Sequence, residues 1–316
     1  MRPADPPRSA LPRSAPPRSA PPRSVTPRSA TPPFRLSGRA AGDSPLLLAS
    51  PHSGRWLPEE FLAGCAVAAA ALRCLEDAHV GLLLRRSAEA GVPLIEATHA
   101  RAILDLNRAE QEYDPAMLDG RLPHPPLPSE RVRRGYGLFP KFAAPGIAIH
   151  RARIPATTAA ARIEALHRPW HSAIGAALDA ARRRHGFAVL LDVHSMPPLA
   201  AGNGTAARLV LGDRFGRSAA PALVDWLEEA FAAEGLKVAR NRPYAGGHDV
   251  ERHGAPGAGL HAVQLEFDRS LYMDPGSLEP HEGFDLLAAM LARVVGRLSA
   301  WLARKPLAGG LPLAAE

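Results

Sequence analysis

The chain has 316 residues, 46% of them hydrophobic, and a formal net charge of +7. This hydrophobic fraction excludes a wholly disordered protein, and the presence of only two cysteines excludes a disulfide framework and a four-cysteine zinc site. The first 33 residues hold six arginines and one aspartate, a charge of +5, which leaves +2 (7 − 5) for the rest. A body so close to neutral is not expected to bind nucleic acid through its phosphates.

Residues 1–33 contain eleven of the 33 prolines and repeat Pro-Arg-Ser five times at a five-residue period. Proline at this density blocks helices and sheet ladders, and the segment has few large apolar side chains to bury. We therefore predict a disordered tail at 1–33 and a single α/β domain at 34–316. A tail that binds anions or is phosphorylated on its serines is the alternative, and a neutral extension is the simpler interpretation.

Beyond residue 33, the pattern of apolar residues indicates the class of fold. Short apolar runs bounded by turn residues predict strands at 45–50, 92–97, 187–193, 207–211 and 260–267. The run 187–193 is apolar almost throughout, which is typical of a central strand buried on both faces.

Helix patterns alternate with these strands. One helix is expected to begin near Pro58, and others are predicted at 158–185, 219–232 and 284–302. Pro169 should kink or divide the helix at 158–185. The alternation predicts an α/β fold with three αβα layers and a mixed, mostly parallel central sheet.

Two further expectations concern the loops and the setting of the protein. Residues 114–146 include seven prolines, so they should form a long loop, and a loop of that length is often a lid or a wall of a site. The apolar runs are short and the N-terminus has no apolar signal region. We therefore expect no membrane-spanning segment and a cytoplasmic protein.

Polar residues follow three of the predicted strands, at the edge where ligands of an open α/β sheet collect. His52 follows the first strand, and Asp192 and His194 end the central one. In the last strand, a period of two places Gln264, Glu266 and Asp268 on one face. Polar groups at the end of a buried strand are costly unless they are paired or bound, and neutral imidazole is a good ligand for zinc.

Each of these groups also has a simpler structural interpretation. His52 is equally compatible with an ordinary turn histidine, and the acids of the last strand with a solvated edge. A competing zinc pattern is the pair His167 and His171, four residues apart on a helix, but no HExxH glutamate accompanies it and Pro169 lies between them. A serine nucleophile is poorly supported because the chain has no G-x-S-x-G elbow.

Five motifs in order bring these residues together. They are PHSGR (51–55), DLNR (105–108), DVHSMPP (192–198), NRPYAGG (241–247) and LHAVQLEFDRSLYMD (260–274). Their order strongly resembles that of the N-formylglutamate amidohydrolase family, over nearly all of the chain from about Phe34 to Trp301. That family is similar in turn to the zinc carboxypeptidases and aspartoacylase-like hydrolases, so the resemblance implies a carboxypeptidase-like (phosphorylase/hydrolase-like) fold.

The resemblance implies a role for several residues. His52 and His194 would bind a zinc ion (Zn²⁺), and Glu266 would be the general base. Where carboxypeptidases have a ligand glutamate three residues after the first histidine, this chain has Arg55. The third ligand is therefore expected to be Asp77, and the alternatives are Glu59, Asp105 and Asp192.

The resemblance also implies a substrate. It is N-formyl-L-glutamate, a small dicarboxylate whose formyl amide would be hydrolysed to formate and L-glutamate, a step of histidine degradation. Asn107 and Arg108 would hold one carboxylate, and the candidates for the second are Arg55, Arg242 and Arg269. The other expected substrate contacts are Tyr244, Gly246, Gly247 and His253. The alternatives are a zinc-dependent deacylase of another N-acylated or formiminated amino acid and a non-catalytic ligand-binding relative.

Overall fold

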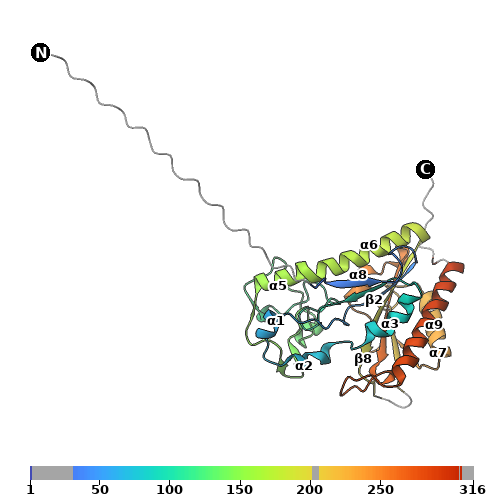
Figure 1. Ribbon diagram of the computed structural model, residues 1–316. Helices are drawn as coiled ribbons and strands as arrows, with labels where there is room; N and C mark the ends of the chain where they lie inside the picture. Colours follow the sequence, from blue (N-terminus) through green and yellow to red (C-terminus); the bar gives the residue numbers. More distant parts are fainter. Residues whose placement is uncertain (2–30, 201–205, 306, 308–316) are drawn as a thin grey trace. The chain divides into compact units, whose positions relative to one another are not determined.

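The computed structural model describes residues 1, 31–200, 206–305 and 307 (Figure 1). The described residues from Pro32 onward form one compact unit. The disordered tail predicted at 1–33 therefore lies almost wholly outside the described residues, and it stays a prediction.

A seven-stranded mixed sheet forms the centre of this unit. In spatial order its strands are β1 (Phe34–Ser37), β3 (Leu94–Ala97), β2 (Leu46–Ser50), β8 (Ala188–Met196), β11 (Leu260–Asp268), β9 (Leu209–Gly212) and β10 (Val238–Arg240). The four strands β3, β2, β8 and β11 run parallel to one another, whereas β1 is antiparallel to β3 and β9 is antiparallel to β11. Both β8 and β11 are buried over nearly their whole length, as expected for central strands between two helical layers.

Helices cover both faces of the sheet (Figure 1). One layer consists of α3 (Val80–Glu89), α7 (Pro221–Ala233) and α9 (Gly283–Arg304), and the other of α5 (Ala156–Arg162), α6 (Arg168–His185) and α8 (His248–His253). The shorter elements are α1 (Glu59–Ala63), α2 (Ala69–Leu72), α4 (Glu130–Arg133), β4 (Leu118–Asp119), β5 (Phe142–Ala144), β6 (Ile147–Ala148) and β7 (Ile154–Pro155). This arrangement confirms the predicted three-layer α/β fold with a mostly parallel sheet.

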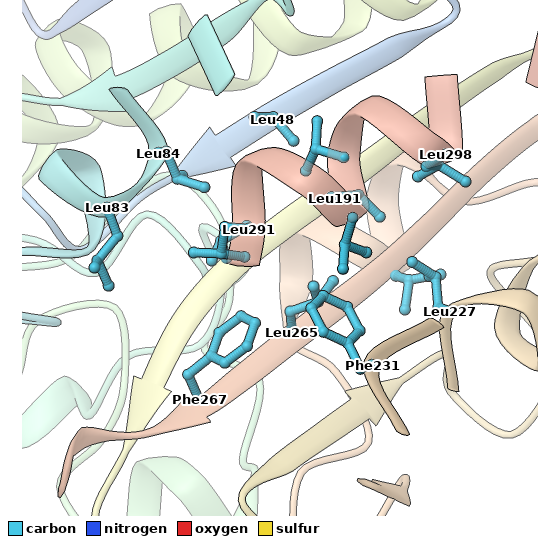
Figure 2. Packing of buried hydrophobic residues seen from close by; sticks show 14 of the residues in the cluster. Leu48, Leu83, Leu84, Leu191, Leu227, Phe231, Leu265, Phe267, Leu291 and Leu298 are labelled. Atoms are coloured by element: carbon cyan, nitrogen blue, oxygen red, sulfur yellow. The ribbon is translucent and has the colours of Figure 1, made fainter. Parts of the chain in front are cut away.

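Alternation along the strands divides the core into two parts. Leu48, Leu191 and Leu265 face the layer of α3, α7 and α9, where they pack against Leu291 and Phe231 (Figure 2). Leu47, Ala49 and Leu190, which alternate with them, belong to the core on the other side of the sheet, beneath α6. Because each buried leucine contributes about 1.5–3 kcal/mol, both faces of the sheet stabilise the fold.

The helix predicted at 158–185 is helical without a break from Ala156 to His185, so Pro169 does not divide it. A π-helical turn, Ile163–His167, joins α5 to α6 and ends two residues before that proline. Proline lacks the N–H that would continue the regular ladder, and a π-helical turn accommodates the missing hydrogen bond.

The expectation that no segment is long and apolar enough to span a membrane needs a correction at α9. Among the described residues, this helix is long and apolar enough to cross a membrane, judged by length and composition alone. Its apolar residues Leu287, Leu291, Val294 and Leu298 are buried against the sheet, so here they serve the core of the fold. No long apolar run marks this helix in the sequence, because small residues and single arginines interrupt its leucines.

Candidate active site

The carboxyl ends of three neighbouring parallel strands bring the predicted site residues to one edge of the sheet. His52 lies two residues after β2, His194 is in β8 and Glu266 is in β11. In the β8–β11 ladder, Glu266 is directly opposite His194, and Gln264 is opposite Asp192. Residues so far apart in sequence meet because parallel strands end on the same side.

The sequence of each central strand changes character along one face. In β8, Ala188 and Leu190 belong to the core beneath α6, and Asp192 and His194 continue the same face. In β11, Ala262 is followed in the same way by Gln264 and Glu266. The first half of each strand therefore stabilises the sheet, and the second half carries the polar side chains.

Two imidazoles and a carboxylate converge within hydrogen-bond distance. His52 Nδ1 lies 3.1 Å from His194 Nδ1, and Asp77 Oδ2 lies 3.2 Å from the first and 2.8 Å from the second. All three residues are about 2% exposed. Burying such a group is unfavourable without a shared proton or cation to neutralise it.

The outer nitrogen of each imidazole contacts a second carboxylate. His52 Nε2 lies 2.7 Å from Asp105 Oδ1, and His194 Nε2 lies 2.9 Å from Asp192 Oδ2. Carboxylates in this position fix the tautomer and direct the Nδ1 lone pairs toward a metal. Two histidines and one carboxylate form a donor set that zinc uses in catalytic sites, with one position left open for water.

Two of the alternative third ligands thus lie behind the histidines rather than between them. Asp105 and Asp192 contact the outer nitrogens, whereas Asp77 faces both inner ones. Glu59 is exposed at the start of α1 and does not line the cavity described below. The geometry therefore favours Asp77 among the candidates considered from the sequence.

The electric field of these acids favours a positive charge at the site. Burial alone would lower the pKa of His194, but Asp192 and Asp77 outweigh it and raise that pKa well above the usual range. Burial would likewise raise the pKa of Asp77, but hydrogen bonds from His194 and His52 hold it well below its ordinary value. A group of charges that stabilises an imidazolium in this way also attracts a divalent cation.

Glu266 has the properties of an acid–base group. Burial is the main cause that raises its pKa to about 7, and the nearby Asp77 and Asp192 raise it further against the opposing effect of His194. Its Oε1 accepts a hydrogen bond of 2.7 Å from Gln264 Nε2. A carboxyl group whose pKa is near neutrality can both accept and return a proton.

These groups open onto a cavity of about 730 Å³, a size suited to a small molecule. The predicted site residues that line it are His52, Asp77, Asn107, Arg108, His194, Tyr244, Gly246, Gly247, Glu266 and Arg269. Arg55 and Arg242, two candidates for the second substrate carboxylate, do not line it.

Asn107 connects several of the residues that line this cavity. Its Nδ2 lies 3.1 Å from His194 Nε2 and 3.3 Å from Gln264 Oε1. A Cβ atom added to Gly247 would lie 2.3 Å from Asn107 Oδ1, so only glycine leaves room for this carboxamide. Gly247 N–H in turn donates to Gln264 Oε1 at 2.7 Å.

Arg269 and Arg108 line the cavity but are partly engaged with the protein itself. Arg269 Nη2 donates to Asp77 Oδ1 at 3.3 Å and to the carbonyl of Glu76 at 2.8 Å. Arg108 donates to the carbonyls of Tyr136 and Asn107 at 2.8 and 2.6 Å. Arg269 therefore orients Asp77, and Arg108 Nη2 lies 3.8 Å from Asp105 Oδ2.

Comparison with known proteins places the chain in a family. The N-formylglutamate amidohydrolase family model matches residues 44–273. The chain belongs to this family. An "N-formylglutamate deformylase" of Pseudomonas putida is 30% identical over 84% of this chain and 96% of that one, and one of Pseudomonas aeruginosa is 32% identical over 74% and 84%. A crystal structure of N-formylglutamate amidohydrolase from Ralstonia eutropha superimposes with a TM-score of 0.82 at 35% identity, over 87% of this chain and 99% of that one.

In this member of the N-formylglutamate amidohydrolase family, the cavity also has arginines that the sequence motifs did not indicate. Arg101, Arg131 and Arg134 also line the cavity. The segment 114–146, predicted as one long loop, contains the short elements β4, α4 and β5, and part of it lines the cavity as a wall. Arg131 lies in α4, and its Nη2 donates to the carbonyl of Gly246 at 3.1 Å. The only sequence signal for this arginine was the position of the loop, because it belongs to no motif.

One expected substrate contact lies elsewhere in this family member. His253 does not line the cavity, and its Nε2 lies 3.1 Å from His171 Nδ1 in a separate group of buried histidines. The glycines at 246 and 247 suggested that the whole stretch would surround the ligand. Helix α8 begins directly after them, however, and turns His253 toward α6.

Proposed function

We propose that the chain hydrolyses the formyl amide of N-formyl-L-glutamate to formate and L-glutamate. The observation that carries the proposal is the position of Glu266, beside a histidine–aspartate triad and at the base of a cavity lined by arginines. The named activity of the curated relatives supports it. Histidine degradation in the cytoplasm is the setting that we propose for this reaction.

The metal is the second part of the proposal. His52, Asp77 and His194 would hold a zinc ion, because their facing atoms lie 2.8–3.2 Å apart and form a donor set that zinc accepts. When bound, such an ion lowers the pKa of a water molecule and polarises a carbonyl oxygen. Asp105 and Asp192 hold the two imidazoles in the required tautomer.

Glu266 carries the proton through the reaction. Its carboxylate accepts a proton from the attacking water as the water oxygen bonds to the formyl carbon. The same carboxyl group then donates that proton to the amide nitrogen as the C–N bond breaks. The products are formic acid and the amine of glutamate, and the proton of the acid passes to the amine to give formate and the ammonium form. The hydrogen bond from Gln264 keeps Glu266 in position for both transfers.

Two arginines would select a dicarboxylate. Arg108 lines the cavity next to Asn107, and Arg131 lines it from α4 in the segment 114–146. An arginine binds a carboxylate through two parallel hydrogen bonds, which fixes the position of the ligand as well as its charge. Tyr244 lines the same cavity and completes the proposed set of substrate contacts.

Formate release by the purified chain tests this function. We expect release from N-formyl-L-glutamate, loss of release after treatment with a chelator and recovery when zinc is added back. N-formyl-L-leucine and N-acetyl-L-glutamate, tested alongside by release of the free amino acid, separate the choice of the side chain from that of the acyl group. Faster turnover of another acyl amino acid would assign a different deacylase, and no turnover of any substrate would indicate a non-catalytic relative.

A further inference from the structure

A second group of buried histidines lies where α6 meets α8. His167 and His171 come from the end of the π-helical turn and the first turn of α6, and His248, Asp249 and His253 come from α8. Four of the five residues are less than 9% exposed, and His248 is half-buried. None of them lines the cavity of the candidate active site.

Backbone carbonyls fix the tautomers of the two helix-borne histidines. His171 Nε2 donates to the carbonyl of Leu106 at 3.0 Å, and His167 Nε2 donates to the carbonyl of Arg108 at 2.7 Å. A carbonyl only accepts, so each Nε2 carries the proton and each Nδ1 carries a lone pair. This is the outer contact that metal-binding histidines make in proteins.

Several atoms of the group have no hydrogen-bond partner although they are buried. These atoms are His167 Nδ1, His248 Nδ1 and Asp249 Oδ2. The nearest acids, Glu110 at 3.6 Å from His167 and Glu251 at 3.8 Å from His248, are too distant to form a hydrogen bond. Unpartnered buried polar atoms are rare in folded proteins, and an unseen ion is one of the explanations for them.

The geometry around His171 repeats that of the candidate active site. His171 Nδ1 lies 3.1 Å from His253 Nε2 and 3.5 Å from Asp249 Oδ1. In a tetrahedral zinc site with bonds of about 2.0–2.1 Å, the ligand atoms lie about 3.3 Å apart. The ligand atoms of Asp249 and His253 lie within 4.8 Å of each other, so the group presents a second set of two imidazoles and one carboxylate around His171.

We propose that His171, Asp249 and His253 bind a second divalent metal ion of the zinc class. His248 is the adjacent candidate for the fourth ligand, because one of its ring nitrogens lies within 4.8 Å of one on His171. Such a closed set is typical of a structural metal site.

The second site is connected to the first through the segment 105–108. Asp249 N–H donates to Asn107 Oδ1 at 2.8 Å, and His171 contacts the carbonyl of Leu106. The side chains of Asp105 and Asn107 in the same segment contact His52 and His194. An ion bound by α6 and α8 would therefore hold the floor of the active site in place without touching the substrate.

Zinc content per chain tests the second site separately from catalysis. The wild-type chain, loaded with zinc and freed of excess by dialysis, should contain two ions by mass spectrometry. The double variant Asp249→Asn/His253→Gln should lose one of them, since an amide keeps the shape of the carboxyl but is a poor ligand. The variant His52→Ala/His194→Ala should also keep one ion, bound at the second site.

Two results would overturn the proposal. One is a His52→Ala/His194→Ala chain that contains no zinc, and the other is an Asp249→Asn/His253→Gln chain that still contains two ions. If the latter variant does not fold, as judged by circular dichroism, the zinc retained by the former decides. Anomalous scattering at the zinc edge from wild-type crystals gives an independent answer, with a peak expected among His171, Asp249 and His253 and its absence counting against the site.

Discussion

At the scale of single residues, Glu266 shows the conflict between activity and stability. Its pKa of about 7 means that the folded chain holds a proton more tightly than the unfolded chain, where the ordinary value is 4.5. Ionisation of Glu266 therefore destabilises the fold as the pH rises from about 4.5 to about 7. The carboxyl group remains at this cost because a neutral side chain cannot transfer a proton.

We predict that Glu266→Gln removes both effects. Formate release should fall by about 10²–10⁴-fold while bound zinc is unchanged. The metal-free variant should be more stable than wild type by about 1–3 kcal/mol at pH 8 and nearly equal to it at pH 5. Urea denaturation at the two pH values measures the difference, and the exposed Glu229→Gln is the control. An equal difference at both pH values would contradict the pKa argument.

The same carboxyl group sets the expected pH dependence of turnover. Glu266 must be ionised to accept a proton, so kcat/KM should rise with pH and level off above the pKa of the group. That pKa is about 7 without metal, and a bound zinc ion stabilises the carboxylate and moves the rise to lower pH. Rate measurements from pH 5 to 9 test this, and kcat/KM that falls across pH 5–7 would refute it.

A further prediction at this scale concerns the carboxylate behind His52. Asp105→Asn should weaken zinc binding by about 10–100-fold, because the amide no longer fixes the tautomer of the imidazole. Asp213→Asn is a matched control, since Asp213 is also buried but bonds to Asn241 and lies outside the cavity. Competition with a chromophoric chelator measures both affinities, and equal values for the two variants would argue against the role of Asp105.

At the scale of elements, the sequence predicted the parts whose apolar pattern is strong. The strands β2, β8 and β11 lie where their apolar runs predicted them, because buried strands need such runs. Helix α3 was missed: the residue before it, His79, has a left-handed conformation, and its side chain makes no capping bond. Strand β1 was missed because three of its four residues are exposed, so it has no burial pattern.

The site residues that lie at the ends of strands were predictable from the sequence. His52, His194 and Glu266 follow apolar strands, and their convergence could be expected from parallel topology. Asp77 lies in a turn before α3 and belongs to no regular element, so only the family resemblance indicated it. Arg131 reaches the cavity from α4, a helix of four residues in a proline-rich segment, and no residue spacing predicts its position there.

Helix α4 permits a direct test of the proposed contact between Arg131 and the substrate. Arg131 lines the cavity, whereas Arg133 on the same helix is exposed and paired with Glu130 at 2.7 Å. Arg131→Ala should raise KM for N-formyl-L-glutamate by about 10–100-fold, the loss of a hydrogen bond to a charged group. The effect on N-formyl-L-leucine should be smaller, and Arg133→Ala should change neither substrate. Equal KM values for the two variants would remove Arg131 from the proposed substrate contacts.

At the scale of the whole molecule, the residues proposed to act on the substrate all lie within one part of the chain. The family match covers 44–273, which includes every residue proposed to act on the substrate. The compact unit begins at Pro32, and the carbonyl of Pro33 accepts a hydrogen bond of 3.2 Å from Thr98 N–H, next to β3. Most of the positive charge, +5 of +7, lies in residues 1–33, apart from the matched region.

Two truncations separate the contribution of this segment from that of β1. Deletion of residues 2–30 should leave kcat/KM unchanged, because the contacts of Pro32 and Pro33 with Thr98 remain. Deletion of residues 2–37 also removes β1, which pairs with β3 over four residues, and should lower the melting temperature. Kinetics and thermal denaturation of both chains measure these effects. A large loss of kcat/KM in the shorter deletion would show that the arginine repeat acts in catalysis, and a matching loss of salt-dependent nucleic-acid binding would show that it binds phosphates.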